Sequence, residues 1–137
     1  AAHLVIGDAA LMLYAAMQAG ATRFRHAYDL GSVWREWTGL PFVFAVWVAQ
    51  RSVPVAAALS VHASLIASRD WGLSHLDALA EEAHQATGVR PSECRAYLEG
   101  LDYGLRFAHL NGLAEFFRRL EVAGRVPASS LAFLPAA

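Results

Sequence analysis

The chain has 137 residues and a formal net charge of −1, and arginine supplies all 11 of its basic residues. The absence of lysine excludes Schiff-base chemistry and the phosphate-binding lysine of a P-loop. The near-neutral balance, with no basic run, argues against a nucleic-acid partner. Hydrophobic residues make up 56% of the sequence, above the roughly 45–50% of an average soluble domain. We therefore expect either an unusually large core or apolar faces that something outside these residues covers.

The sequence carries no signal for export or membrane insertion. Residues 1–8 lack an initiator methionine, a basic region and a cleavage pattern, so they do not resemble a signal peptide. The longest apolar run, residues 42–49, is about eight residues long, whereas a membrane-spanning helix needs about 20. The single cysteine, Cys94, allows no internal disulfide and is expected to be a surface or half-buried structural thiol. We expect a soluble, cytoplasmic protein with no membrane partner.

The N-terminal part predicts a strand, a tight turn and a helix. Residues 3–6 are apolar and rich in β-branched side chains, and Gly7-Asp8 follows them directly. An alanine-rich helix is predicted over residues 9–19, with Asp8 as its N-cap and Gly20 ending it at positive φ. Residues 21–29 predict a loop.

The remaining elements are one strand and several helices. A short helix is expected from residue 31 to 38, ending before Gly39 and Pro41. A second strand follows over residues 42–48 and is apolar on both faces, as buried parallel strands are. Four helices are predicted after it: residues 52–68, a helix that begins at a capping box of Ser74 and Asp77 and ends at Gly88, residues 91–101, and a helix from an Asn111 cap to Gly124. The third is expected to continue to residue 110 with a break at Gly104. A tail over 125–137 follows.

Two strands are too few for a stable sheet, since three or more are needed. A strand that is apolar on both faces also requires neighbours on both edges and cover on both sides. The pattern therefore predicts an α/β protein whose other strands lie outside these 137 residues. The alternative is a mostly helical domain in which residues 42–49 form a buried helical segment; the short run and Pro41 count against it.

The best candidate for chemistry is the turn Gly7-Asp8-Ala9. A strand that leads into a helix N-terminus presents free backbone N–H groups and the positive end of the helix dipole, which together bind carboxylates and phosphates. Open α/β sheets place ligands at this end of their strands. The simpler interpretation is that Asp8 is only an N-cap, worth about 1 kcal/mol, and the two roles are compatible.

Other chemistry lacks its signature in this sequence. No pair among the six histidines has the spacing of a helical zinc site, so no metal is expected. His62 is interpreted as a hydrogen-bonded core histidine. Neither a GxSxG elbow nor a GxGxxG loop is present. The remaining clusters are interpreted as structural, with solvated helix faces at 81–82 and 118–119 and a core stripe of Leu113, Phe116, Phe117 and Leu120.

Two strings carry a resemblance to a known family, IGDAAL at 6–11 and YDLGSVWREWTGLPFVFAVWVA at 28–49. They resemble the menaquinone-biosynthesis family of the futalosine pathway, specifically its chorismate dehydratase branch. The family's type 2 periplasmic-binding-protein-like fold has two lobes and about twice this length, so the chain resembles its helix-rich C-terminal half. The resemblance places residues 1–41 in the second lobe, makes 42–49 the crossing strand, and leaves 50–137 as helices that complete the first lobe, with a C-terminal tail.

The resemblance implies a carbon-oxygen lyase that removes water from chorismate to give 3-[(1-carboxyvinyl)oxy]benzoate, without metal or organic cofactor. Gly7, Asp8 and Ala9 would then line the substrate cleft, with backbone amides toward a carboxylate of this dicarboxylate substrate. The general base is not identified in this chain. It is expected on the N-terminal half of the same protein, unless the substrate's own carboxylate serves.

Two alternatives remain open at this point. The sister enzyme 1,4-dihydroxy-6-naphthoate synthase shares the fold, but the resemblance leads us to expect a histidine in the strand-turn motif there. This chain has no histidine between residues 4 and 25, which favours the dehydratase. A solute-binding protein for a small carboxylate would bind the ligand without converting it.

Overall fold

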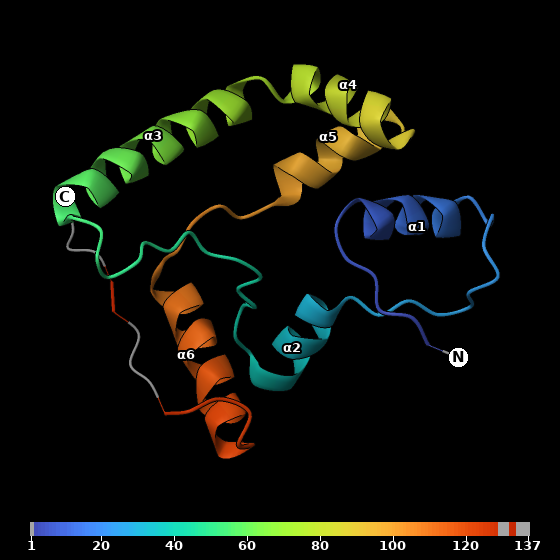
Figure 1. Ribbon diagram of the computed structural model, residues 1–137. Helices are drawn as coiled ribbons and strands as arrows, with labels where there is room; N and C mark the ends of the chain where they lie inside the picture. The colour runs from blue at the N-terminus through green and yellow to red at the C-terminus, as the bar shows by residue number, and fades with distance from the viewer. Residues whose placement is uncertain (1, 129–131, 134–137) are drawn as a thin grey trace. The chain divides into compact units, whose positions relative to one another are not determined.

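A computed structural model describes residues 2–128, 132 and 133. Within these residues the chain forms six helices joined by loops (Figure 1). They are α1 (Asp8–Gln18), α2 (Leu30–Thr38), α3 (Val55–Ser74), α4 (Leu76–Thr87), α5 (Pro91–Gly100) and α6 (Phe107–Val122). The chain divides into two compact units. Unit 1 comprises the residues up to 27 together with 66–102, and unit 2 comprises 28–65 together with those from 103 onward.

The predicted helix ends are confirmed where glycine marks them. Gly39 and Gly88 are left-handed C-caps of α2 and α4, with φ of 74° and 72°. Gly20 and Gly124 also have positive φ just after α1 and α6. Such a residue lets the chain turn away while its N–H bonds back to a carbonyl of the last turn, as Gly88 N–H does to the His84 oxygen at 2.7 Å.

The helix starts correct several predictions. Asp8 is the first residue of α1 and Gly7 is its N-cap, so the predicted Asp8 cap is wrong. Ser74 does not cap α4, because its hydroxyl donates to the Trp71 carbonyl inside α3, and α3 runs on to Ser74 instead of ending at 68. Asn111 lies within α6, which begins at Phe107, and residues 101–106 are not helical. Hydroxyl and amide side chains can bond to nearby backbone inside a helix as well as at its end.

Residues 3–6 and 42–48 are not assigned to a strand in the described part of the chain. A strand exists only as part of a hydrogen-bonded ladder, and neither segment has a ladder partner among the described residues. The side chains of Leu4 and Ile6 are 83% and 85% exposed. The sheet of an α/β protein, the two-lobed fold and the lobe boundaries at 41 and 49 stay predictions.

The core of unit 1 consists of small residues between α4 and α5. Ala80, Val89 and Cys94 are buried, and α1 packs Leu11 and Ala15 against them. Cys94 is 1% exposed and its thiol donates to the Val89 carbonyl at 3.5 Å. The prediction of a surface or half-buried thiol was therefore wrong about exposure, because α5 turns this position toward α4.

The core of unit 2 is aromatic and centres on Trp34, which is 7% exposed. Its ring meets Phe42 and Phe116 edge to face, with centroids 5.8 and 5.7 Å apart, and these two phenylalanines meet each other at 5.3 Å. This geometry is the one that aromatic pairs prefer. Phe116 thus joins the core as the predicted stripe on α6 requires, whereas His62 on α3 is exposed and is not a core histidine.

Gly112 allows the loop after α2 to lie directly on α6. A Cβ at this position would overlap the Pro41 carbonyl oxygen and would lie 3.8 Å from the Leu40 side chain. The same loop is held from the other side, because Thr38 Oγ1 donates to the Trp34 carbonyl at 2.8 Å and accepts from Leu40 N–H at 3.2 Å. The backbone around Pro41 is therefore fixed between α2 and α6.

Few of the hydrophobic residues are buried in the described part of the chain. The buried ones are Trp34, Ala58, Ala80, Val89 and Cys94. Large side chains are exposed in both units, among them Ile6, Trp47, Val48 and Phe107. Of the two explanations for the hydrophobic composition, the structure therefore favours uncovered apolar faces over a large core.

We predict that Gly112→Ala destabilises the protein by about 1–3 kcal/mol, because the added methyl group must displace the Pro41 backbone. Gly100→Ala is the matched control, since nothing lies within 4 Å of the added atom there; alanine's helix propensity should stabilise it by up to about 1 kcal/mol. Chemical denaturation monitored by helix content measures both. Equal free energies of unfolding for the two variants would contradict the packing described.

Candidate functional site

The N-terminus of α1 is shaped by the backbone of Gly7. Its φ of 66° and ψ of −147° lie in a region that is essentially restricted to glycine. This conformation turns the chain so that the Gly7 carbonyl accepts from Ala10 N–H at 2.9 Å and from Leu11 N–H at 3.2 Å. Gly7, and not Asp8 as predicted, therefore forms the N-cap turn, and Asp8 is the first residue of α1.

The predicted site residues Gly7, Asp8 and Ala9 lie together at the start of α1, and all three are exposed. The Asp8 side chain makes no capping hydrogen bond. The first N–H groups of a helix have no partner within the helix, so Asp8 and Ala9 present theirs to solvent at the positive end of the dipole. This arrangement can bind a carboxylate through two backbone donors, while the Asp8 carboxylate beside it is stabilised by the same dipole.

A cationic loop lies beside the segment that leads into this turn. His3 meets Phe24 edge to face with centroids 5.5 Å apart, and the Arg23 guanidinium lies 5.7 Å from the centre of the Phe24 ring. Both interactions lie within unit 1. The sequence analysis assigned residues 21–29 only to a loop and missed this arrangement, although the alternation Arg23-Phe24-Arg25-His26 was a readable signal.

Unit 1 also contains an open groove of about 640 Å³ that does not include the predicted site residues. Its charged residues, Arg90 and Glu93, bind each other at 2.5 Å. Their hydrogen bond raises the pKa of Arg90 and lowers that of Glu93. The groove is lined by Met12, Ala15, Ala16, Gln18, Ala19, Thr87, Gly88, Val89, Arg90 and Glu93.

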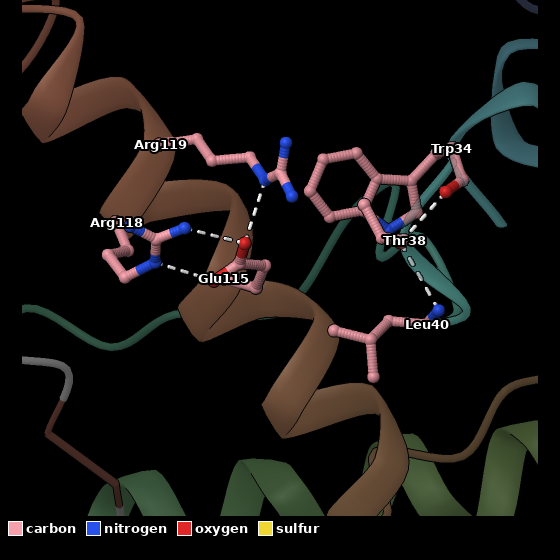
Figure 2. Close-up of polar contacts among 6 residues, drawn as sticks. All are labelled: Trp34, Thr38, Leu40, Glu115, Arg118 and Arg119. Atoms are coloured by element: carbon pink, nitrogen blue, oxygen red, sulfur yellow. Dashed lines mark hydrogen bonds and ion pairs between the residues drawn. The ribbon is translucent and has the colours of Figure 1, made fainter.

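In unit 2 an arginine of α6 covers the aromatic face of α2. The Arg119 guanidinium lies 3.9 Å from the centre of the Trp37 ring and 5.6 Å from that of Trp34, within the range of cation–π attraction. Figure 2 shows Arg119 extending from α6 toward the Trp34 ring. The prediction that residues 118 and 119 form a solvated face was wrong for Arg119, because its flat guanidinium packs on the rings.

Glu115 holds both arginines of this α6 cluster. It accepts from Arg118 Nε and Nη2 at 2.7 and 2.8 Å and from Arg119 Nε at 2.8 Å (Figure 2). The hydrogen bonds from Arg118 and then Arg119 lower the pKa of Glu115 to about 2. Glu115 therefore orients Arg119 over the tryptophans, and the cluster serves the packing of α2 on α6.

Across residues 2–128 with 132 and 133, no group of three or more His, Cys, Asp or Glu side chains could hold a metal ion. In the same residues, each helix is too short or too polar to cross a membrane.

Comparison with known proteins gives a family match over most of the chain. Residues 1–122 match a family model described as menaquinone biosynthesis. The chain belongs to this menaquinone-biosynthesis family. A curated relative from Thermus thermophilus, named chorismate dehydratase, is 36% identical over 127 residues, which cover 85% of this chain and 46% of the relative. No solved structure matches the chain.

The curated relative's name supports the resemblance to the chorismate dehydratase branch of the family. The family match includes both the turn at 6–11 and the segment at 28–49. The chain spans about half the length of the curated relative it matches. Family membership does not say which residues of this chain contact substrate. The roles of Gly7, Asp8 and Ala9 therefore stay predictions.

We predict that the Glu115 cluster stabilises the protein in a pH-dependent way. Because its pKa falls from 4.5 to about 2 on folding, the contribution is complete above pH 4.5 and is lost as the pH falls through about 2. Glu115→Gln should therefore lower the melting temperature at pH 6 and make no difference near pH 2. Thermal unfolding across this range measures it, with exposed Glu81→Gln as the control. A difference that stays constant with pH would argue against the ion pair.

Proposed function

We propose that the protein containing this chain is a chorismate dehydratase that removes water from chorismate to give 3-[(1-carboxyvinyl)oxy]benzoate in menaquinone biosynthesis. The observation that carries the proposal is the 36% identity to a protein of that name over 85% of the chain. The reaction is a carbon-oxygen lyase reaction: one ring C–H bond and one ring C–O bond break, the hydroxyl leaves as water, and the ring becomes aromatic. We assign no metal or organic cofactor to it.

To promote this reaction the protein mainly has to orient the substrate and transfer its ring proton. Aromatisation favours the product, so the protein must hold the dicarboxylate, remove the ring proton and help the hydroxyl to leave. In the proposed site the N–H groups of Asp8 and Ala9 bind one carboxylate, with Gly7 setting their direction. The exposed position of these groups supports this role, since a ligand can reach them without any change in the helix.

The proposal places the general base outside this chain, on a polypeptide equivalent to the N-terminal half of the family, or on the substrate's own carboxylate. It also places the reaction in the cytoplasm. The solute-binding alternative differs in one respect that can be measured, because a binding protein returns its ligand unchanged.

Incubation of the full-length protein with chorismate, followed by mass spectrometry, tests the reaction. We expect loss of one water from chorismate and accumulation of the carboxyvinyloxy benzoate. Saturable binding with chorismate recovered intact would refute the dehydratase and identify a binding protein.

We predict that Asp8→Ala lowers dehydratase activity while changing stability little. The side chain makes no capping bond, so only its interaction with the helix dipole is lost, worth about 0.3–1 kcal/mol. Asp77→Ala is the matched control, because Asp77 also lies in the first turn of its helix and is exposed. Both variants should melt within a few degrees of the wild type, and only Asp8→Ala should slow turnover. Wild-type turnover by Asp8→Ala would remove Asp8 from the site.

A further inference from the structure

The chain contains a single asparagine, Asn111, and it stands directly before Gly112. Both residues lie in α6, where the Asn111 side chain is exposed and Gly112 is buried. The backbone of Pro41 lies against Gly112, since a Cβ there would overlap the Pro41 carbonyl oxygen. The packing of unit 2 therefore requires glycine at the position that follows the asparagine.

An asparagine followed by glycine has a reaction available to it that needs only water. The backbone nitrogen of Gly112 attacks the side-chain carbonyl carbon of Asn111, and the new C–N bond closes a succinimide ring. The bond from that carbon to the side-chain nitrogen breaks, and this nitrogen leaves as ammonia with the proton that Gly112 loses. Water then opens the ring at either carbonyl, which gives aspartate or isoaspartate. Glycine permits the attack most readily because no Cβ shields its nitrogen.

The folded helix prevents this attack. The Gly112 nitrogen must turn toward the Asn111 side chain, whereas an N–H inside an α-helix points along the axis and donates to the carbonyl four residues earlier. Gly112 lies more than one turn inside α6, which begins at Phe107, so its N–H is held in this way. The Pro41 backbone also lies against it. The reaction therefore requires that the start of α6 unwinds and that Pro41 moves away.

The start of α6 is exposed. The Phe107 side chain is 79% exposed, and residues 101–106 before it are not helical. Arg106 N–H donates to His109 Nδ1 at 3.1 Å across the first turn. Helix ends open more easily than helix interiors, because they have fewer backbone hydrogen bonds to break. The contact between Gly112 and Pro41 is therefore the main obstacle to the reaction.

Isoaspartate at position 111 does not fit back into α6. Its main chain runs through the former side chain, which adds one carbon atom to the backbone before Gly112. The hydrogen bonds of the helix then lose their register, and Gly112 no longer faces Pro41. Phe116, one turn further along α6, loses its place against Trp34, whose ring centroid lies 5.7 Å from its own. A chemical change in the opened state thus makes the opening irreversible.

We propose that Asn111 is a deamidation site whose reaction rate is set by local opening of α6, and that isoaspartate formed there permanently disrupts the packing of α6 on Trp34. Water is the only other reactant. This inference concerns the stability of unit 2 and does not depend on the proposed function.

The test keeps the full-length protein that contains this chain at mildly alkaline pH, either folded or in urea, and digests samples with trypsin. Trypsin cleaves after arginine, so residues 107–118 form one peptide that includes Asn111. Mass spectrometry measures the gain in mass as the side-chain amide becomes an acid, and electron-transfer fragmentation distinguishes aspartate from isoaspartate. We expect the reaction in both samples, at least about tenfold slower in the folded one because it needs local opening.

Weakening the loop at Pro41 should speed the reaction in the folded protein. Thr38 Oγ1 holds this loop by donating to the Trp34 carbonyl at 2.8 Å and accepting from Leu40 N–H at 3.2 Å. Thr38→Val removes both hydrogen bonds and puts a methyl group in place of the hydroxyl. We expect deamidation of the folded variant to be about three to ten times faster than in the wild type, and its rate in urea to be unchanged.

Thr87→Val is the matched control in unit 1. Thr87 Oγ1 donates to the Ala83 carbonyl at 2.7 Å and accepts from Val89 N–H at 3.2 Å, so the substitution removes the equivalent hydrogen bonds at the end of α4. The rate at Asn111 should stay at the wild-type value. Asn111→Gln, whose longer side chain has to close a larger and less favourable ring, should keep the fold and show no gain in mass.

The isoaspartate form, separated by ion-exchange chromatography, should have less helix by circular dichroism and red-shifted tryptophan fluorescence. No gain in mass of the 107–118 peptide in urea would overturn the site itself. A folded sample that reacts as fast as the one in urea would overturn the role of α6. Equal acceleration by Thr38→Val and Thr87→Val would do the same, because it would assign the reaction to unfolding of the whole protein. An isoaspartate form with native helix content and fluorescence would refute the consequence for Trp34.

Discussion

The contact between the Pro41 carbonyl and the α6 backbone at Gly112 is the constraint on which unit 2 depends. Only a residue without a side chain lets a loop approach a helix so closely. The approach brings Phe42 into the aromatic cluster around Trp34, while Arg119 of α6 lies over the rings of Trp34 and Trp37. The direction in which residues 42–48 leave this loop follows from the same contact, because Pro41 immediately precedes them.

The helices were largely predictable from the sequence, including the start of α5 at Pro91, but the starts of α4 and α6 were not. Glycines at the ends of α1, α2, α4 and α6 marked where these helices stop, because a helix often ends at a residue with positive φ and glycine adopts that conformation most easily. Ser74 and Asn111 misled for a related reason. Their side chains have capping chemistry, but whether they use it depends on where the first hydrogen-bonded turn forms, and neighbours several residues away decide that.

The helix N-terminus at residues 7–9 was predictable from the sequence, and its detailed geometry was less so. Gly7, Asp8 and Ala9 do stand at a helix N-terminus, yet Gly7 takes the capping position and Asp8 is left with a free carboxylate. The loop over residues 21–29 was predicted, but the position of Arg23 near the N-terminal segment was not, because it depends on the contact between His3 and Phe24, which are 21 residues apart. Burial of Cys94 likewise depends on how α5 faces α4. Contacts between distant residues have no signature in a local pattern.

The conformation of Gly7 has a consequence for handedness. Its φ of 66° and ψ of −147° are close to the mirror image of the polyproline II conformation. A D-amino acid would adopt this geometry without strain, whereas an L-residue has its Cβ on the wrong side; glycine is achiral and has no Cβ. The genetic code offers no D-residue, so glycine is the one encoded residue that fits. The start of α1 is therefore fixed by chirality, with no contribution from a side chain.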